Sequence, residues 1–295
     1  TLTVNGATHR DAYGGWTAGT GTSKALKNNS TGNTVNLAGG TVRNIYGGFT
    51  SSAGGSATGN KVNISGGSIA PAAGVGGTVY GAKNAGTGAA TGSTITITGG
   101  TLHDVYGGHA AAGATTGNTV NLMSGTVRNI YGGFTSSDGG SATGNKVNIS
   151  GGTVGTGGTV YGGFVSHAGA GDATGNTVTI TGGSMKDVYA GFTNGTGATT
   201  GNIVNLGDGT NAMASGTSIT GTLAGGNQAT ATDNTLNVNT NAAVGNIKNF
   251  AKISFKLDGA VNASDALLKL TGGATTGLDW AGVDVTPANY TFTPK

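Results

Sequence analysis

Apolar and polar residues alternate in short runs that recur along most of the chain. Apolar side chains at every second position bury one face of a β-strand, so Val35 and Leu37 are predicted to point inward and Asn36 outward. Each run therefore predicts a short strand with one buried face. The runs are TVNL (34–37), KVNI (61–64), TITI (94–97), TVNL (119–122), KVNI (146–149), TVTI (177–180), IVNL (203–206) and TLNV (235–238).

A tyrosine followed by small residues, mostly glycines, marks each repeat as well. The intervals between successive tyrosines are 33, 34, 26, 25, 30 and 28 residues, and we expect the glycines to form a turn with positive φ. The stretch Thr41–Gly67 returns at Thr126–Gly152, 85 residues later, with Asp138 in place of Ala53 as the single change. A globular core cannot absorb such variable intervals, whereas a solenoid places the extra residues in loops outside its coils. The tyrosines are Tyr13, Tyr46, Tyr80, Tyr106, Tyr131, Tyr161 and Tyr189.

These two patterns predict an all-β fold, a single right-handed parallel β-helix (β-solenoid) of about 8–10 coils with loop excursions. Residues 1–30 are expected to form a degenerate first coil and residues 31–239 the repeat solenoid. Residues 240–295 are expected to form divergent C-terminal coils that act as a partial cap. The pattern weakens after Gly207, where Leu223 is expected to take the place of the tyrosine.

Composition narrows the class of protein. The 62 glycines follow no Gly-X-Y period, which excludes collagen, and the absence of glutamate beside many Thr and Val residues favours strands. Without cysteine the chain has no disulfides or thiolate metal sites. A net charge of +3 is too low for a nucleic-acid interface, and no apolar run reaches the ~20 residues of a membrane helix. We therefore expect neither nucleic-acid binding nor membrane insertion of this segment.

Because Thr1 begins in mid-pattern, the chain is expected to be an excerpt whose targeting segments lie elsewhere.

An asparagine precedes each alternating run, with Ser93 as the exception. Stacked side-chain amides can hydrogen-bond from coil to coil, and asparagine tolerates the left-handed backbone of a tight turn. We therefore predict a structural ladder at this position. Its members are Asn33, Asn60, Asn118, Asn145, Asn176, Asn202 and Asn234.

Two further columns flank the tyrosines and are the candidate binding residues. Three residues before each tyrosine lie Arg10, Arg43, Gly77, His103, Arg128, Gly158 and Lys186. Three residues after it lie Trp16, Phe49, Lys83, His109, Phe134, Phe164 and Phe192. The cations either pair with Asp or Asn of their own or a neighbouring coil, or form a positive stripe that attracts anionic glycans. The rings form a sugar-stacking ladder if they face outward and a second internal stack if they face inward. Strand parity cannot decide between these two across a Gly-Gly pair.

The aspartates give little support for catalysis. Asp11, Asp104 and Asp187 fall two residues before a tyrosine, where other coils have Asn or Thr, and this exchange suggests hydrogen bonding to a turn. Polysaccharide-active enzymes on β-helices need clustered carboxylates or Ca²⁺ ligands. We therefore expect no catalytic residues, no metal site and no cofactor, and a polysaccharide-active enzyme remains the weakest alternative.

The repeated [IV]YGG…TGNxVxIxGG units, followed by NIKNFAKISFKLDG, resemble the passenger regions of Gram-negative autotransporter and filamentous-haemagglutinin-type adhesins. The resemblance implies a right-handed parallel β-helix that is secreted and lies on the bacterial cell surface, outside the outer membrane. It also implies a virulence-related role in cell adhesion or self-aggregation, with a host-cell surface, a glycan or sister copies of the chain as partners. The alternative is an inert stalk or spacer that carries a distant binding module.

Overall fold

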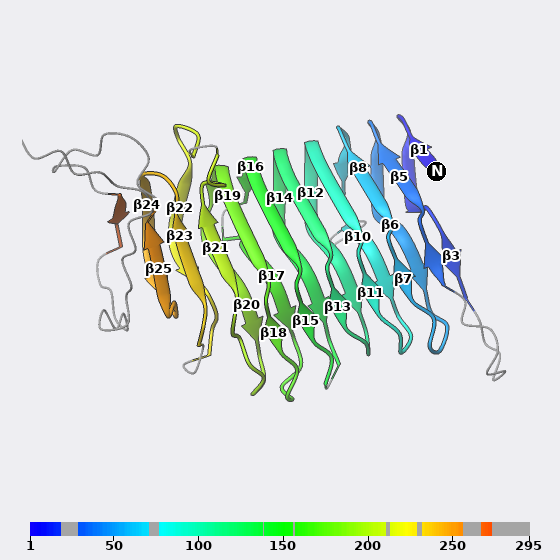
Figure 1. The fold of residues 1–295 in the computed structure, drawn as a ribbon. Helices are drawn as coiled ribbons and strands as arrows, with labels where there is room; N and C mark the ends of the chain where they lie inside the picture. Colours follow the sequence, from blue (N-terminus) through cyan, green and yellow to red (C-terminus); the bar gives the residue numbers. More distant parts are fainter. Residues whose placement is uncertain are drawn as a thin grey trace, which may run out of the picture.

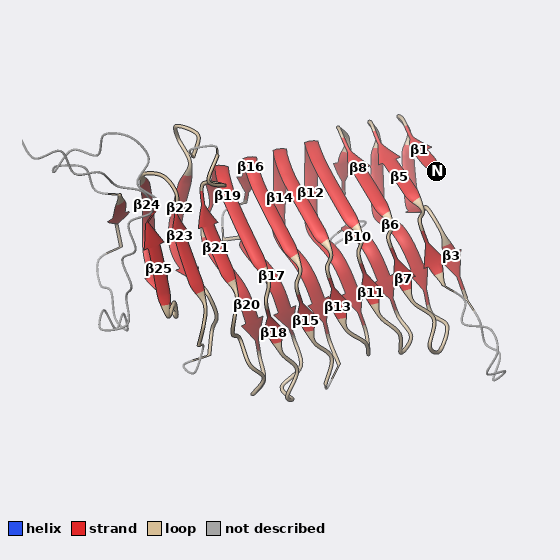
Figure 2. Cartoon of the chain, viewed as in Figure 1, coloured by secondary structure: helices blue, strands red, loops and turns tan. Residues whose placement is uncertain are grey.

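The computed structural model describes residues 1–18, 29–70, 77–137, 139–155, 157–210, 213–228, 232–255 and 267–272. Within these ranges the chain forms strands and loops without any helix (Figure 2). It follows that none of the described residues belongs to a helix long and apolar enough to cross a membrane.

The alternating runs form one column of parallel strands, as predicted. Val35 and Leu37 are fully buried, and the register places Asn36 beside Asn63 of the next strand. The column therefore has one core face and one outer face. Its strands are β1 (Leu2–Val4), β5 (Thr34–Leu37), β8 (Lys61–Ile64), the first parts of β12 (Thr94–Ala110), β14 (Thr119–Thr135), β16 (Lys146–Val154) and β19 (Thr177–Met185), then β21 (Ile203–Leu206), β23 (Thr235–Val238) and β25 (Lys252–Phe255).

A second column of parallel strands carries the tyrosines, which pair with one another from Tyr13 to Tyr189. We number the coils 1 to 7 by these tyrosines. The strands are β2 (Thr8–Tyr13), β3 (Trp16–Thr17), β6 (Thr41–Thr50), β9 (Ser68–Ile69), β10 (Thr78–Asn84), the later parts of β12, β14, β16 and β19, then β17 (Thr159–Val165), β20 (Asp187–Thr193), β22 (Ser218–Ala224), β24 (Ala242–Lys248) and β26 (Leu268–Leu270).

A third, narrower column consists of two-residue strands. It places a buried small residue first and an outward threonine second, as in Ala142 and Thr143. Its strands are β4 (Ser30–Thr31), β7 (Ala57–Thr58), β11 (Ala90–Thr91), β13 (Thr115–Thr116), β15 (Ala142–Thr143) and β18 (Ala173–Thr174). The three columns together give a β-helical, solenoid-like body, whose successive coils lie side by side from one end of the molecule to the other (Figure 1).

The core is a continuous stack of Val, Ile and Leu side chains that runs from Val4 to Ile253. β24, β25 and β26 continue the parallel pairing beyond the repeats. The rest of the predicted C-terminal cap, and residues 19–28 of the predicted first coil, lie outside the described residues.

Two local predictions are wrong. Ala224, and not Leu223, pairs with Tyr189, because a register shift between Ile219 and Thr222 moves Leu223 into the buried column opposite Val188. The glycines after the tyrosines do not have the predicted positive φ: in coils 2 to 7 they lie within the strands, and in coil 1 Gly14 and Gly15 lie between β2 and β3. Positive φ recurs instead at two other places in the coils. One is the residue before the ladder position, such as Gly144 at φ 62°, where Asp233 takes this conformation before Asn234. The other is a glycine that follows the alternating run, such as Gly152 at φ 77°.

The 85-residue duplication spans three coils, since it carries Tyr46 of coil 2 onto Tyr131 of coil 5. The solenoid is therefore built from blocks of three coils, which determines how the outer side chains pair.

Candidate functional site

The tyrosines and the residues three positions after them form one outer surface, which we call the aromatic face. It consists of Tyr13, Trp16, Tyr46, Phe49, Tyr80, Lys83, Tyr106, His109, Tyr131, Phe134, Tyr161, Phe164, Tyr189 and Phe192. Trp16 is 63% exposed, and the other members are buried or half-buried.

Both columns of the aromatic face point away from the core because alternation breaks at the glycine pair. In coil 4, Val105 and Ala110 are fully buried, and both intervening glycines also face inward. A Cβ atom at Gly107 would lie 3.2 Å from the Cβ of Asn118, and one at Gly108 would collide with the amide of Asn118. Two successive inward positions put the rings before and after them on the same outer side. Of the two orientations left open for the phenylalanine column, the structure therefore has the outer one.

The rings pack face to face along each column and edge to face between columns. Tyr106 and Tyr131 lie 4.6 Å apart at an interplanar angle of 4°, and Phe134 and Phe164 lie 5.3 Å apart, also at 4°. Tyr131 and Phe134 meet at 85°. Each such contact contributes about 0.5–1.5 kcal/mol beyond burial. Inside the columns the ring faces are covered by the next coil, so mainly ring edges are left for solvent.

Lys83 interrupts the phenylalanine column and substitutes for a ring. Its Nζ lies 4.4 Å from the ring centroid of Tyr80 and 5.6 Å from that of Tyr46, in a cation–π arrangement. Burial lowers the pKa of Lys83, and it lowers that of His109 to about 4, with Lys83 as the second cause. Burial also raises the pKa of Tyr131 to about 12, helped by the charge of Asp104. The face is therefore an apolar environment with neutral phenols and a neutral imidazole.

The basic column is tied to the aspartates of neighbouring coils. The guanidinium of Arg43 donates to both carboxylate oxygens of Asp11, at 2.8 and 3.3 Å, and that of Arg128 donates to Asp104 at 2.7 and 3.2 Å. Such bidentate pairs are the stronger kind of ion pair. Of the two alternatives that the sequence left open for Arg43 and Arg128, the structure shows the one in which the cations pair with aspartates. Asp11, Asp104 and Asp187 neutralise most of the positive charge of the column. Its four cations and these three anions leave a net charge of +1; the cations are Arg10, Arg43, Arg128 and Lys186.

The cations at the two ends of this column are more exposed and form longer ion pairs. Arg10 is 82% exposed and lies 3.8 Å from Asp11, and Lys186 is 56% exposed and lies 3.7 Å from Asp187. Any attraction of the column for anions is therefore concentrated in coils 1 and 7.

The aspartates bond across coils and not to a turn of their own coil, which corrects the sequence expectation. Asp104 accepts from Asn129 Nδ2 at 2.8 Å, and Asn129 Oδ1 in turn accepts from the backbone of Thr159 at 2.9 Å. The same relay begins at Asp11. The order Asp, Asn, Thr therefore repeats with the three-coil block.

The asparagine ladder is confirmed by its hydrogen bonds. Asn145 Oδ1 accepts from both the backbone nitrogen and Nδ2 of Asn118, at 3.1 and 3.0 Å. Asn145 Nδ2 donates to Asn176 Oδ1 at 3.1 Å and to the carbonyl of Thr115 at 3.1 Å. Asn60, Asn118, Asn145, Asn176, Asn202 and Asn234 are fully buried, so these amides hold the scaffold and are closed to ligands.

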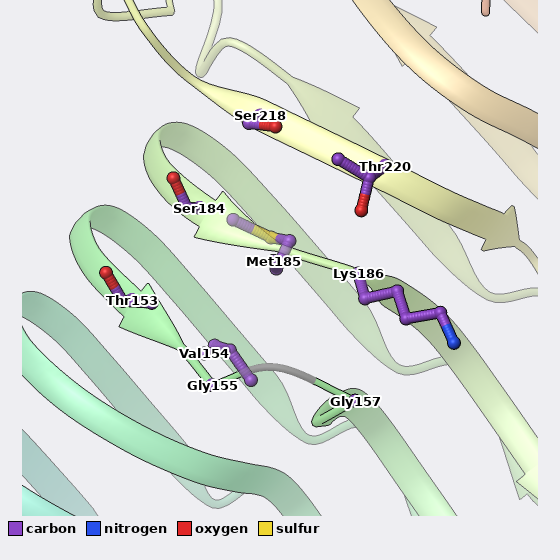
Figure 3. A pocket seen from close by; sticks show the side chains of 9 residues that line it. All are labelled: Thr153, Val154, Gly155, Gly157, Ser184, Met185, Lys186, Ser218 and Thr220. Carbon is purple, nitrogen blue, oxygen red and sulfur yellow. The ribbon is translucent and has the colours of Figure 1, made fainter.

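A shallow hollow lies beside the basic column, from coil 6 to β22, the strand that follows coil 7 (Figure 3). Its volume is about 250 Å³, Val154 and Met185 form an apolar floor, and Thr153, Ser184 and Ser218 lie in a row across successive strands. In coil 6, Tyr161 follows Val154 by seven positions, whereas in coil 5 Tyr131 follows Val127 by four, so coil 6 has three extra residues next to the hollow. The spacing contained this signal, but sequence reasoning treated the insertion only as a loop. The hollow is smaller than the ~300–1,000 Å³ of typical ligand pockets.

Within the described ranges, no three His, Asp or Glu side chains lie close enough together to hold a metal ion. No protein-family model, curated protein or solved structure matches the chain. The fold and the aromatic face are therefore the features from which function is inferred.

Proposed function

We propose that the chain forms a stiff rod of a secreted bacterial surface adhesin, outside the outer membrane, and that these coils act as a stalk and not as a glycan-binding site. We also infer that the rod is a single right-handed β-helix, as nearly all parallel crossovers are right-handed. One observation carries the proposal: the side chains that would bind glycans are used in contacts between coils.

The aromatic column lacks the geometry for sugar stacking. A sugar ring binds an aromatic residue by lying on its face, but the faces of Phe134 and Phe164 cover each other. The cations Arg43 and Arg128 already bind carboxylates. An anionic glycan would have to break these pairs to bind in the middle of the rod.

The same contacts favour stiffness. Every described coil from 1 to 7 is joined to the next by parallel strand pairing, by the buried ladder and by stacked tyrosines. Bending the rod would open several of these contacts at once. A stalk that holds a binding module away from the cell needs this property.

The length of the rod can be tested by distance measurement. Thr3 and Ser254 occupy the same outer column at its two ends, nine strand steps apart. Labels on the Thr3→Cys, Ser254→Cys variant of this cysteine-free chain should give one narrow distance distribution near 43 Å, at about 4.8 Å per step. A broad distribution would contradict a stiff rod.

Binding is tested with beads coated with the chain. We expect no attachment to mammalian cells or immobilised glycans, and no change when Phe49, Phe134, Phe164 and Phe192 are replaced by Ala in a variant that still folds. Attachment lost in that variant, or in Arg43→Gln with Arg128→Gln, would show that the columns bind a partner and would reject the stalk proposal.

A further inference from the structure

Among the described residues, coils 3 and 4 lack three kinds of side-chain contact that join other neighbouring coils. The first is the amide–amide bond of the buried ladder, because coil 3 has Ser93 in place of asparagine. The backbone nitrogen of Ser93 donates to Asn118 Oδ1 at 3.0 Å, but its side chain has no amide to add a second bond. Between coils 4 and 5 both bonds are present, since Asn118 donates to Asn145 from its backbone and from its side chain. The buried ladder is therefore thinner at the boundary of coils 3 and 4.

The second missing contact belongs to the outer face of the first strand column. Asn148 donates to Asn121 at 2.8 Å between coils 4 and 5, and Asn205 donates to Thr179 Oγ1 at 3.1 Å between coils 6 and 7. In coil 3 this position is Thr96, which lies opposite Asn121 in register without a hydrogen bond to it. The outer side chains therefore do not tie coil 3 to coil 4.

The third missing contact is the ring stack of the phenylalanine column. Phe164 and Phe192 stack between coils 6 and 7, with their centroids 5.2 Å apart at an angle of 7°. Between coils 3 and 4 the same column has Lys83 in register with His109. Two basic side chains thus meet where other coils bring two rings together. Coils 6 and 7 take the same place in the next three-coil block, so their boundary is the matched comparison.

His109 is enclosed by the aromatic face. Tyr80 of β10 and Tyr106 of β12 meet its ring edge to face, and Phe134 of β14 stacks on it at 4.9 Å. Its Nδ1 is buried without a hydrogen-bond partner. Lys83 is the charged group that acts on it, whereas burial raises the pKa of both tyrosines, which stay neutral. A proton on His109 would therefore place a second positive charge in an enclosed site beside Lys83.

We propose that the boundary between coils 3 and 4 is a joint at which the rod opens first, and that acid promotes this opening. In the open state His109 and Lys83 regain contact with water, so protons favour that state. In the closed state β10 and β12 are paired and Tyr80 stacks on Tyr106 at 5.2 Å, which keeps the joint shut at neutral pH. Opening would expose the covered faces of these two rings. The inference goes beyond the stalk proposed above, because it concerns where the rod comes apart.

Hydrogen exchange of backbone amides tests the joint, since it reports local opening. The amide of Thr119 donates to Ser93 between coils 3 and 4, and that of Ile203 donates to Asn176 between coils 6 and 7, both at 2.8 Å. At pH 7, after correction for intrinsic rates, we expect Thr119 to exchange about tenfold faster than Ile203. Equal protection of the two amides at pH 7 and at pH 4.5 would overturn the proposal.

The role of acid is tested by repeating the measurement at pH 4.5. The ratio of the two exchange rates should grow about 50-fold, as expected for one histidine with a pKa of about 6.5 in the open state and about 4 in the closed state. His109→Phe should abolish this growth and keep the difference seen at pH 7. A ratio that does not change with pH in the unmodified chain would reject His109 as the acid-sensitive group of the joint.

Two further variants test the missing contacts directly. Thr96→Asn supplies the outer amide and should slow the exchange of Thr119 severalfold at both pH values. Phe164→Lys combined with Phe192→His transfers the basic pair to the matched boundary and should make Ile203 exchange faster in acid. A folded transfer variant in which Ile203 keeps its protection in acid would show that the pair does not make a joint.

The stalk proposal and the joint can fail separately. The distance measurement between positions 3 and 254 at pH 7 does not depend on the joint, which is shut at this pH. A narrow distribution together with equal amide protection at the two boundaries would keep the stalk and reject the joint. A broad distribution at pH 7 would reject the stalk.

Discussion

Ala82 and Ser93 depart together from the pattern of the neighbouring coils. Ala82 pairs in register with Gly48 and Gly108, and Ser93 replaces the ladder asparagine of the same coil. The next coil has Gly108 and Asn118, where a Cβ atom on the glycine would collide with the amide. The larger residue at one position is therefore matched by the smaller residue at the other.

This relationship predicts a non-additive pair of substitutions. Ser93→Asn alone should destabilise the protein by about 1–3 kcal/mol, because its amide has no space beside the methyl group of Ala82. Ala82→Gly combined with Ser93→Asn should recover most of this loss. Urea unfolding of the two single variants and the double variant gives the coupling free energy. Simple addition of the two single effects would show that the residues do not share this space.

The buried ladder should be more sensitive than the outer one. Asn145→Ala removes the acceptor for two donors of Asn118 and should lower the free energy of unfolding by about 2–4 kcal/mol. Asn148→Ala removes one outer bond, to Asn121, and should cost about 0.5–1 kcal/mol. Thermal melting of the two variants compares the ladders directly. Equal losses would mean that burial of the asparagine amide does not determine how much it contributes to the free energy of unfolding.

His109 should make the protein sensitive to acid. Its pKa in the folded chain is lowered to about 4 by burial, below that of an unfolded histidine at about 6.5, so below pH 6.5 the unfolded state binds more protons. Stability is therefore expected to be constant above this pH, as far as His109 is concerned, and to fall by about 3 kcal/mol as the pH drops to 4.

The matching variant is His109→Phe, which introduces the residue found at this position in four other coils. It should remove this part of the pH dependence without opening the stack. Unfolding measured at pH 7 and pH 4.5 compares the two proteins, and the same slope in both would disprove the role of His109.

The ion pairs on the outer face should contribute unequally. Arg128 is 52% exposed, so Arg128→Ala should cost less than about 1 kcal/mol. Asp104→Ala should cost about 1–2 kcal/mol, because both Arg128 and Asn129 lose their acceptor. Denaturant unfolding in low and high salt would test this, since the Arg128 contribution should shrink with salt. A larger loss from Arg128→Ala than from Asp104→Ala would reverse the assignment.

The alternating runs and the spacing of the tyrosines were enough to predict the parallel strands, the core positions and the ladder. The orientation of Phe134 was not predictable from parity, because two successive inward glycines interrupt the alternation. Still, the joint exchange at Ala82 and Ser93 was visible in the sequence and indicates that the glycines face the ladder. Leu223 was misplaced because one extra residue between Ile219 and Leu223 shifts the register, and only pairing with the previous coil reveals such a shift.

The hydrogen bonds that link Asp104, Asn129 and Thr159 span three coils, and the next coil begins the same sequence again with Asp187. This limits how genes for such rods can change in length. Insertion of one or two coils would leave an arginine without its carboxylate or an aspartate without its amide. Insertion or loss of three coils preserves every hydrogen-bond partner. Residues 41–52 and 126–137 are identical, so unequal recombination between them can add or remove three coils without changing the sequence at the junction. Related rods should therefore differ in reach by steps of about 14 Å, three coil spacings at a time.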